Sequence, residues 1–94
     1  MEQKGNEVKI GAKPIGNYIT SCFYALGKHP KIKLISRGNY IKTAIDTLAI
    51  LEREYLDDCS YDIIIGSDKF GERWVSTLEI IISGKKREKE EKDK

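Results

Sequence analysis

The chain of 94 residues is 39% hydrophobic, which suits one small globular domain with a single core. Its apolar runs are far shorter than the roughly 20 residues that cross a bilayer, and its charged N-terminus is unlike a signal peptide, so we expect no membrane partner. Two cysteines, Cys22 and Cys59, are too few for a disulfide framework, which favours a reducing, cytoplasmic compartment.

Charge is divided unevenly along the chain. Residues 8–45 carry seven Lys and Arg and no acidic residue, whereas residues 46–84 carry three basic and nine acidic residues. A net charge of +7 beside one of −6 favours a basic surface that meets a polyanion and an acidic surface turned away from it. The alternative is that the fold interleaves the two halves and cancels the field.

The chain is expected to begin with a strand and a helix. Residues 1–7 are mostly polar and charged and predict a disordered lead, after which residues 8–10 predict a short strand. Apolar positions at helical spacing then predict a helix over 14–26. Pro14 suits its first turn, because the N–H that proline lacks would have no partner there.

A second strand and helix follow in the same order. Alternating lysines and apolar residues predict a strand over 31–36 with one buried face. A second amphipathic helix is expected from about 40 to 55, with Asn39 as its N-cap. Residues 56–60 are expected to form a polar loop.

The last part of the domain is predicted to form an antiparallel hairpin. Strands are predicted over 61–65 and 73–83, joined by a projecting tip at 66–72. The charged tail 85–94 contains no apolar residue and is expected to be disordered, so the domain would span 8–84. The element order strand-helix-strand-helix-strand-strand predicts an α/β (α+β two-layer) fold, with a four-stranded mixed sheet and two helices on one face.

Two basic residues stand in equivalent strand-to-helix turns. Lys13 follows the first strand and Arg37 follows the second, each beside a helix N-terminus that carries about half a positive charge. Outward-pointing backbone N–H groups in these turns would add to a phosphate site. Lys42, in the first turn of the second helix, is expected at the same edge.

The hairpin tip is expected to form an arm that extends the basic surface made by the two turns. Lys69 and Arg73 provide its charge, and Phe70 is available to pack on a sugar or base. The alternative for Phe70 and Trp74 is packing that stabilises the hairpin. Contacts to phosphate carry no sequence information, so binding would be sequence-tolerant and strongly dependent on salt.

Catalysis is poorly supported by the residues. The single histidine, His29, lies in an expected loop, and neither cysteine has a base or metal-ligand spacing beside it. The glycines also lack the Gly-Lys-Ser/Thr ending of a phosphate-binding P-loop. We therefore expect no enzyme activity, no metal, no cofactor and no small-molecule substrate.

Three segments resemble the Alba family. Ile-Gly-Ala-Lys-Pro-Ile-Gly-Asn-Tyr-Ile at 10–19 resembles its Ile-Gly-Lys-Lys-Pro-x-x-Asn-Tyr-x opening. Residues 35–47, Ile-Ser-Arg-Gly-Asn-Tyr-Ile-Lys-Thr-Ala-Ile-Asp-Thr, are similar to its Arg-Gly-x-x-Ile-x-x-Ala-Val-Asp segment. Residues 75–82 are similar to its closing Val-Ser-x-Ile-Glu-Ile strand, and the three matches fall in the right order over residues 8–83.

The resemblance implies a fold like the C-terminal domain of translation initiation factor three and a chromosome-associated homodimer. It implies binding of double-stranded DNA and RNA without sequence preference, with the basic turns on the backbone and the hairpins in the minor groove. The leading function is therefore that of a dimeric chromatin protein that binds and compacts DNA. The expected nucleic-acid-binding residues are Lys13, Asn17, Arg37, Asn39, Lys42, Lys69, Phe70 and Arg73.

Four positions depart from the family pattern. Ala12 replaces the first of two lysines, and Asn39 stands where a second basic residue is usual. Glu52 and Glu54 occupy helix positions that are often basic in relatives. Fewer phosphate contacts predict weaker DNA binding and a flatter salt dependence than those of a fully basic member.

The second helix and the last strands are the implied dimer surface. We expect a homodimer to pack through Asp46, Leu48, Leu51, Tyr55 and Leu56, with dimers meeting on DNA or a paralogue forming a heterodimer. Two other functions remain open: an RNA-binding or RNA-chaperone role, including a subunit of an RNA-processing complex, and a protein-interaction module that uses the acidic face.

Overall fold

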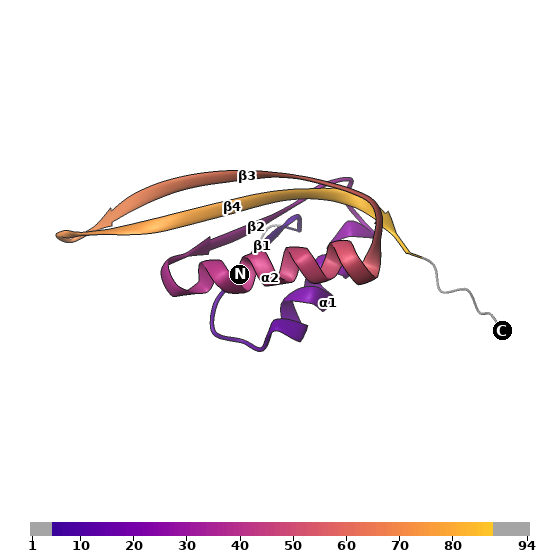
Figure 1. The fold of residues 1–94 in the computed structure, drawn as a ribbon, viewed down its shortest axis with the longest axis horizontal. Helices are drawn as coiled ribbons and strands as arrows, with labels where there is room; N and C mark the ends of the chain where they lie inside the picture. The colour runs from indigo at the N-terminus through magenta and orange to yellow at the C-terminus, as the bar shows by residue number, and fades with distance from the viewer. Residues whose placement is uncertain (1–4, 88–94) are drawn as a thin grey trace.

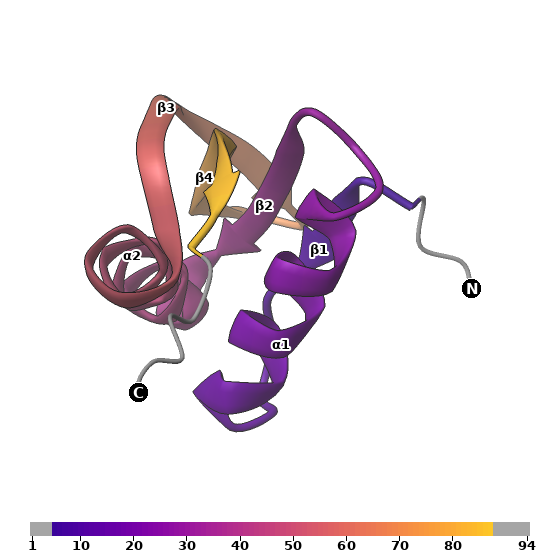
Figure 2. The ribbon, with the colours of Figure 1, turned by 90° about the vertical axis from the view of Figure 1, so that its right-hand side faces the viewer.

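Two helices lie on one face of a four-stranded sheet (Figures 1 and 2). The computed structural model describes residues 5–87. Its elements are β1 (Glu7–Lys9), α1 (Ile15–Leu26), β2 (Ile32–Arg37), a 3₁₀ turn η1 (Gly38–Tyr40), α2 (Ile41–Ile50), a π-helical turn η2 (Leu51–Tyr55), β3 (Leu56–Phe70) and β4 (Arg73–Lys86). No helix in this part of the chain is long and apolar enough to cross a membrane.

The strand order is β1-β2-β4-β3. β1 and β2 pair in parallel, which the α1 crossover between them allows, and the other two pairings are antiparallel. The expected mixed sheet and element order are confirmed. Because parallel strands end at the same edge, the turns that follow β1 and β2 both lie at one end of the sheet.

The core lies between the sheet and the helices. In β2 the alternating residues Ile32 and Leu34 are buried, and they pair with Ile82 and Ile80 of β4 on the same face. The helices contribute a matching set of buried side chains. These are Tyr18, Cys22, Ala25 and Leu26 of α1 and Ala44, Thr47 and Leu48 of α2.

The expected polar loop at 56–60 is wrong, because these residues begin β3. Leu56 is 1% exposed and belongs to the core, so the chain enters the sheet directly from η2. The entry is irregular: Asp58 has a φ of 54°, and the register shifts between Asp57 and Ser60. This irregular first part of β3 explains the loop-like composition.

The folded region extends beyond the expected limits of 8–84. Glu7 lies in β1 and not in a lead, and the carbonyl of Asn6 accepts the N–H of Lys33 at 2.8 Å. At the other end Lys85 and Lys86 complete β4 instead of belonging to a tail. The rest of the expected lead and tail, residues 1–4 and 88–94, lies outside the described residues.

The β3–β4 hairpin projects from the body, as expected, but is longer than the sequence indicated (Figure 1). Its turn is only Gly71-Glu72, with Gly71 at a φ of 63°. Pairing of β4 with β2 ends at Thr77, so residues 67–76 form an arm of two strands alone. The arm contributes to the elongated extents of 57 × 24 × 21 Å.

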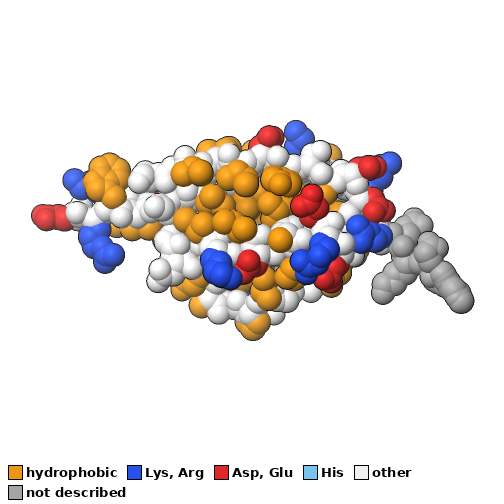
Figure 3. Space-filling model, viewed as in Figure 1, with side chains coloured by type: hydrophobic (Ala, Val, Ile, Leu, Met, Phe, Trp, Pro, Cys, Tyr) orange, Lys and Arg blue, Asp and Glu red, His pale blue; other side chains and the backbone are white. Residues whose placement is uncertain are grey.

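The edge strand β3 leaves apolar side chains at the surface. Tyr61, Ile63 and Ile65 pair with buried residues of β4 and therefore share the helix-bearing face, yet they are 44%, 45% and 78% exposed. Ile45 of α2 is also 45% exposed. Figure 3 shows hydrophobic side chains along β3 and toward α2. We call Ile45, Tyr61, Ile63 and Ile65 the apolar strip.

Candidate nucleic-acid interface

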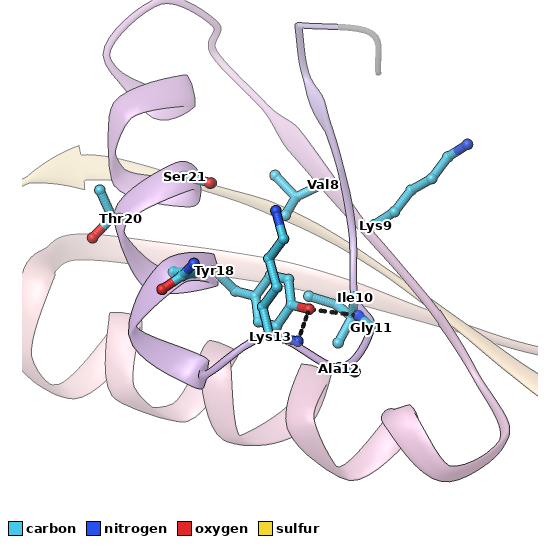
Figure 4. A pocket seen from close by; sticks show the side chains of 10 residues that line it. Val8, Lys9, Ile10, Gly11, Ala12, Lys13, Tyr18, Thr20 and Ser21 are labelled. Atoms are coloured by element: carbon cyan, nitrogen blue, oxygen red, sulfur yellow. Dashed lines mark hydrogen bonds between the residues drawn. The ribbon is translucent and has the colours of Figure 1, made fainter. Parts of the chain in front are cut away.

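The two basic turns lie at the end of the molecule from which the hairpin projects (Figure 1). Lys13 and Asn17 line a surface pocket of about 540 Å³ between the first turn and α1 (Figure 4). Arg37 lines a second pocket of about 400 Å³ on the sheet face without helices. Lys9, the last residue of β1, lines both pockets. The structure thus adds Lys9 to the predicted cations.

Sequence reasoning counted Lys9 only as charge, because a single lysine in a short strand has no distinctive pattern. Its position depends on the register of β1 against β2, in which Lys9 pairs with Ile35. Because side chains alternate along a strand, that register places Lys9 on the same sheet face as Ile35 and Arg37. Arg37 lies two residues beyond Ile35 in β2.

The first turn is held by a buried tyrosine. The hydroxyl of Tyr18 accepts the backbone N–H of Gly11 at 2.8 Å and that of Lys13 at 2.9 Å (Figure 4). Tyr18 is only 6% exposed. These two N–H groups are therefore occupied within the protein, and the expectation that they face an anion is wrong. The exposed side chain of Lys13 remains the cation of this turn.

The second turn differs from the prediction in how the N-terminus of α2 is capped. Gly38 has a φ of 58°, and Asn39 lies inside the 3₁₀ turn η1. No side-chain hydrogen bond caps α2, so the expected N-cap role of Asn39 is wrong. Asn39 is nevertheless exposed beside Arg37, at the predicted edge.

The predicted cation Lys42, and Lys33 of the basic first half, have carboxylate partners within the fold. The ammonium of Lys42 lies 2.7 Å from the carboxylate of Asp46, one helical turn away. Lys33 lies 3.7 Å from Glu79 across the sheet. Some of the positive first half is thus neutralised by the acidic second half. Within residues 5–87, no ion pair joins Lys13 or Arg37 to a carboxylate.

The hairpin tip carries cations and aromatic rings together. Phe70 pairs with Arg73 across the arm, and the guanidinium of Arg37 lies 4.7 Å from the ring centre of Phe70. On the other face of the arm, Lys69 pairs with Trp74, and its ammonium lies 5.8 Å from the ring centre. The tip is therefore joined to the second turn through Arg37.

The predicted dimer residues are only partly accessible. Leu48, Leu51 and Leu56 are 6%, 0% and 1% exposed, so they belong to the core of the protomer and cannot meet a second copy. Helical periodicity placed these leucines on one apolar stripe, but it could not show whether that stripe faces the sheet of the same protomer or a second copy. Asp46 and Tyr55 are accessible. Sequence reasoning missed the apolar strip, because an apolar run in a strand does not show which of its residues a helix covers.

The two thiols are poorly suited to nucleophilic chemistry. Burial raises the pKa of Cys22 to about 12 from its usual 9.0. Burial, and secondly the charge of Glu52, also raises the pKa of Cys59. Among residues 5–87 there is also no group of three His, Cys, Asp or Glu side chains that could hold a metal ion.

Comparison with known proteins connects this arrangement to a family. The sequence model of the Alba family matches residues 6–67. The chain is similar to a solved structure of Alba from Thermoplasma volcanium, with 30% identity and a TM-score of 0.77 over 83% of this chain and 99% of that one. It also shares its fold with ALBA1 from Trypanosoma brucei, at 15% identity and a TM-score of 0.77, over 89% and 73% of the two chains. The chain belongs to the Alba family, whose members generally bind nucleic acids.

Proposed function

We propose that this protein binds double-stranded DNA as a homodimer, without sequence preference, and acts in chromosome architecture. The observation that carries this proposal is the placement of Lys13 and Arg37 in two turns at one end of the sheet, with the hairpin arm beside them. Lys9, which lines the pockets of both turns, adds a third cation. Point charges in this arrangement suit backbone phosphates, which are the same in every sequence.

The homodimer is proposed to form through the apolar strip. Ile65 is 78% exposed although it points to the side of the sheet on which the core lies. A second copy related by a two-fold axis would bring the same strip against this one and bury both. This surface replaces the buried leucines Leu48, Leu51 and Leu56 as the proposed contact.

The proposed function needs neither cofactor nor catalytic residue, and Alba proteins are not typically enzymes. It implies association with the chromosome in the cytoplasm. The second candidate is RNA binding, which the exposed aromatic rings of the hairpin arm favour because unpaired bases stack on such rings.

The proposal is tested by fluorescence anisotropy on matched DNA and RNA duplexes over a salt series. We expect Lys13→Ala and Arg37→Ala to weaken binding and to reduce the slope of log K against log salt by about 0.9 for each phosphate that the variant no longer neutralises. Ala12→Lys should do the opposite, because Ala12 is exposed in the same turn.

The matched control is Lys31→Ala. Lys31 is an exposed lysine just before β2, at the opposite end of the strand from Arg37 and roughly 20 Å away at the usual rise per residue. This variant should bind like the parent. Equally weakened binding in all three alanine variants would show that only overall charge matters, and unchanged binding in Lys13→Ala and Arg37→Ala would refute the proposed phosphate site.

A further inference from the structure

Two large aromatic side chains are exposed at the tip of the hairpin arm. Trp74 is 66% exposed and Phe70 is 44% exposed. Both lie in the two-stranded part of the hairpin, beyond the last pair between β4 and β2, where no third strand pairs with the arm and only the Arg37 side chain reaches over Phe70. Neither ring contributes to the hydrophobic core, so stabilisation of the core does not explain them.

The rings occupy opposite faces of the arm, and each has a cation beside it. Trp74 is directly opposite Lys69, whose ammonium lies 5.8 Å from its ring centre. Phe70 is directly opposite Arg73 and lies 4.7 Å from the guanidinium of Arg37. A flat ring with a cation at its edge or face provides two contacts at once, one for a base and one for the adjacent phosphate.

We propose that the hairpin tip binds unpaired bases of single-stranded nucleic acid by stacking on Trp74. This inference rests on the proposed function, because the basic turns would hold the same strand or an adjoining duplex. Bases inside a duplex are already stacked on their neighbours, so Trp74 reaches a base face only where the strand is open. Lys69 and Arg73 then lie on either side of the arm to contact the flanking phosphates.

The chain offers a direct probe, since Trp74 is its only tryptophan. A base stacked on the indole ring quenches its fluorescence, and no other residue contributes a tryptophan signal. The protein is titrated with an oligothymidylate of 20 nucleotides and, separately, with a blunt 20-base-pair duplex. We expect strong quenching by the single strand and little quenching by the duplex at equal occupancy, with occupancy measured by anisotropy of labelled oligonucleotides.

Three variants separate stacking from charge and folding. Trp74→Ala should weaken single-strand binding about tenfold and leave duplex binding nearly unchanged. Trp74→Phe keeps a flat ring and should recover most of the affinity. Tyr24→Ala is the matched control, because Tyr24 is 64% exposed on α1 with the ammonium of Lys28 at 4.6 Å from its ring centre, away from the arm.

The outcomes distinguish this inference from the proposed function. Unquenched tryptophan in a saturated single-strand complex, or equal effects of Trp74→Ala on both oligonucleotides, would overturn the stacking site and leave duplex binding intact. A parent protein that binds neither oligonucleotide at low salt would overturn both proposals. Weaker single-strand binding in Trp74→Ala, with recovery in Trp74→Phe and parental affinity in Tyr24→Ala, supports stacking.

Discussion

The hydroxyl of Tyr18 accepts the backbone N–H of Lys13 at 2.9 Å, which joins the buried side of α1 to the turn that carries the exposed lysine. The same oxygen accepts the N–H of Gly11 at 2.8 Å. One buried side chain therefore satisfies two donors of a turn that has no regular structure. The position of Lys13 is thus set by the core and not by the turn sequence alone.

Tyr18→Phe tests this relationship. The variant keeps the ring but removes the acceptor of two N–H groups, so we expect the free energy of unfolding to fall by roughly 1–3 kcal/mol. Urea denaturation measures this decrease. Tyr24→Phe, at an exposed position, is the control and should be neutral. Equal stability of Tyr18→Phe and the parent would show that water replaces the hydroxyl at no cost.

Gly38→Ala tests the conformation of the second basic turn. Gly38 has a φ of 58°, which an alanine adopts only with strain, although Val75 leaves room for its Cβ at 3.5 Å. We expect a decrease of about 1 kcal/mol in unfolding free energy. Gly16→Ala in α1 is the matched control: nothing lies within 4 Å of its Cβ, and alanine is the better helix former, so this variant should be slightly more stable. If both variants shift the midpoint of thermal unfolding in the same direction, the positive φ of Gly38 does not limit which residue this turn accepts.

Ile65→Asp tests the apolar strip as a dimer contact. The residue is 78% exposed in the protomer, so the charge should leave the fold intact but should dissociate the dimer. Sedimentation velocity at micromolar concentration measures the change. Ile64→Asp is the control, because Ile64 is 48% exposed on the opposite face of β3, where it pairs with Glu79. A stable monomer in the parent protein would contradict the dimer altogether.

The raised pKa of Cys22 predicts a dependence of stability on pH. The unfolded thiol titrates near 9.0, while the fully buried folded thiol stays protonated until about pH 12. The unfolded state therefore binds fewer protons in this interval, and stability is complete below pH 9.0 and falls as pH rises toward 12. Urea denaturation from pH 8 to 11 should show a steeper decline for the parent than for Cys22→Ala. Parallel declines in the two proteins would contradict the burial of this thiol.

The end of β4 should contribute measurably to stability. The side chain of Arg87 donates to the carbonyls of Arg53 and Leu56 at 2.9 and 3.0 Å and to the carboxylate of Asp57 at 3.1 Å. Removal of residues 85–94 should lower the unfolding free energy by at least about 1 kcal/mol, because it also removes the last pairs with β3. A chain that ends after Arg87 is the control and should match the parent. Equal stability of both truncations would show that this end of the sheet is dispensable.

The order of the elements and the two basic turns follow from patterns that are local in the sequence. Alternation in β2 and helical spacing in α1 follow from which side of each element faces a core, and this information is local. Lys13 and Arg37 are identifiable for the same reason, because each follows a strand and precedes a helix. Two of the three segments that resemble the Alba family, 10–19 and 35–47, contain these two residues.

Which apolar residues are covered, and which backbone N–H groups are already hydrogen-bonded, depends on packing between elements that are distant in the sequence. Leu56 and Ile65 are both apolar residues of one strand, yet Leu56 is 1% exposed and Ile65 is 78% exposed, because the helices cover only part of the edge strand. The N–H of Lys13 is occupied because the register of α1 brings Tyr18 back to the turn. Burial and hydrogen bonding depend on neighbours distant along the chain, and local patterns do not contain their positions.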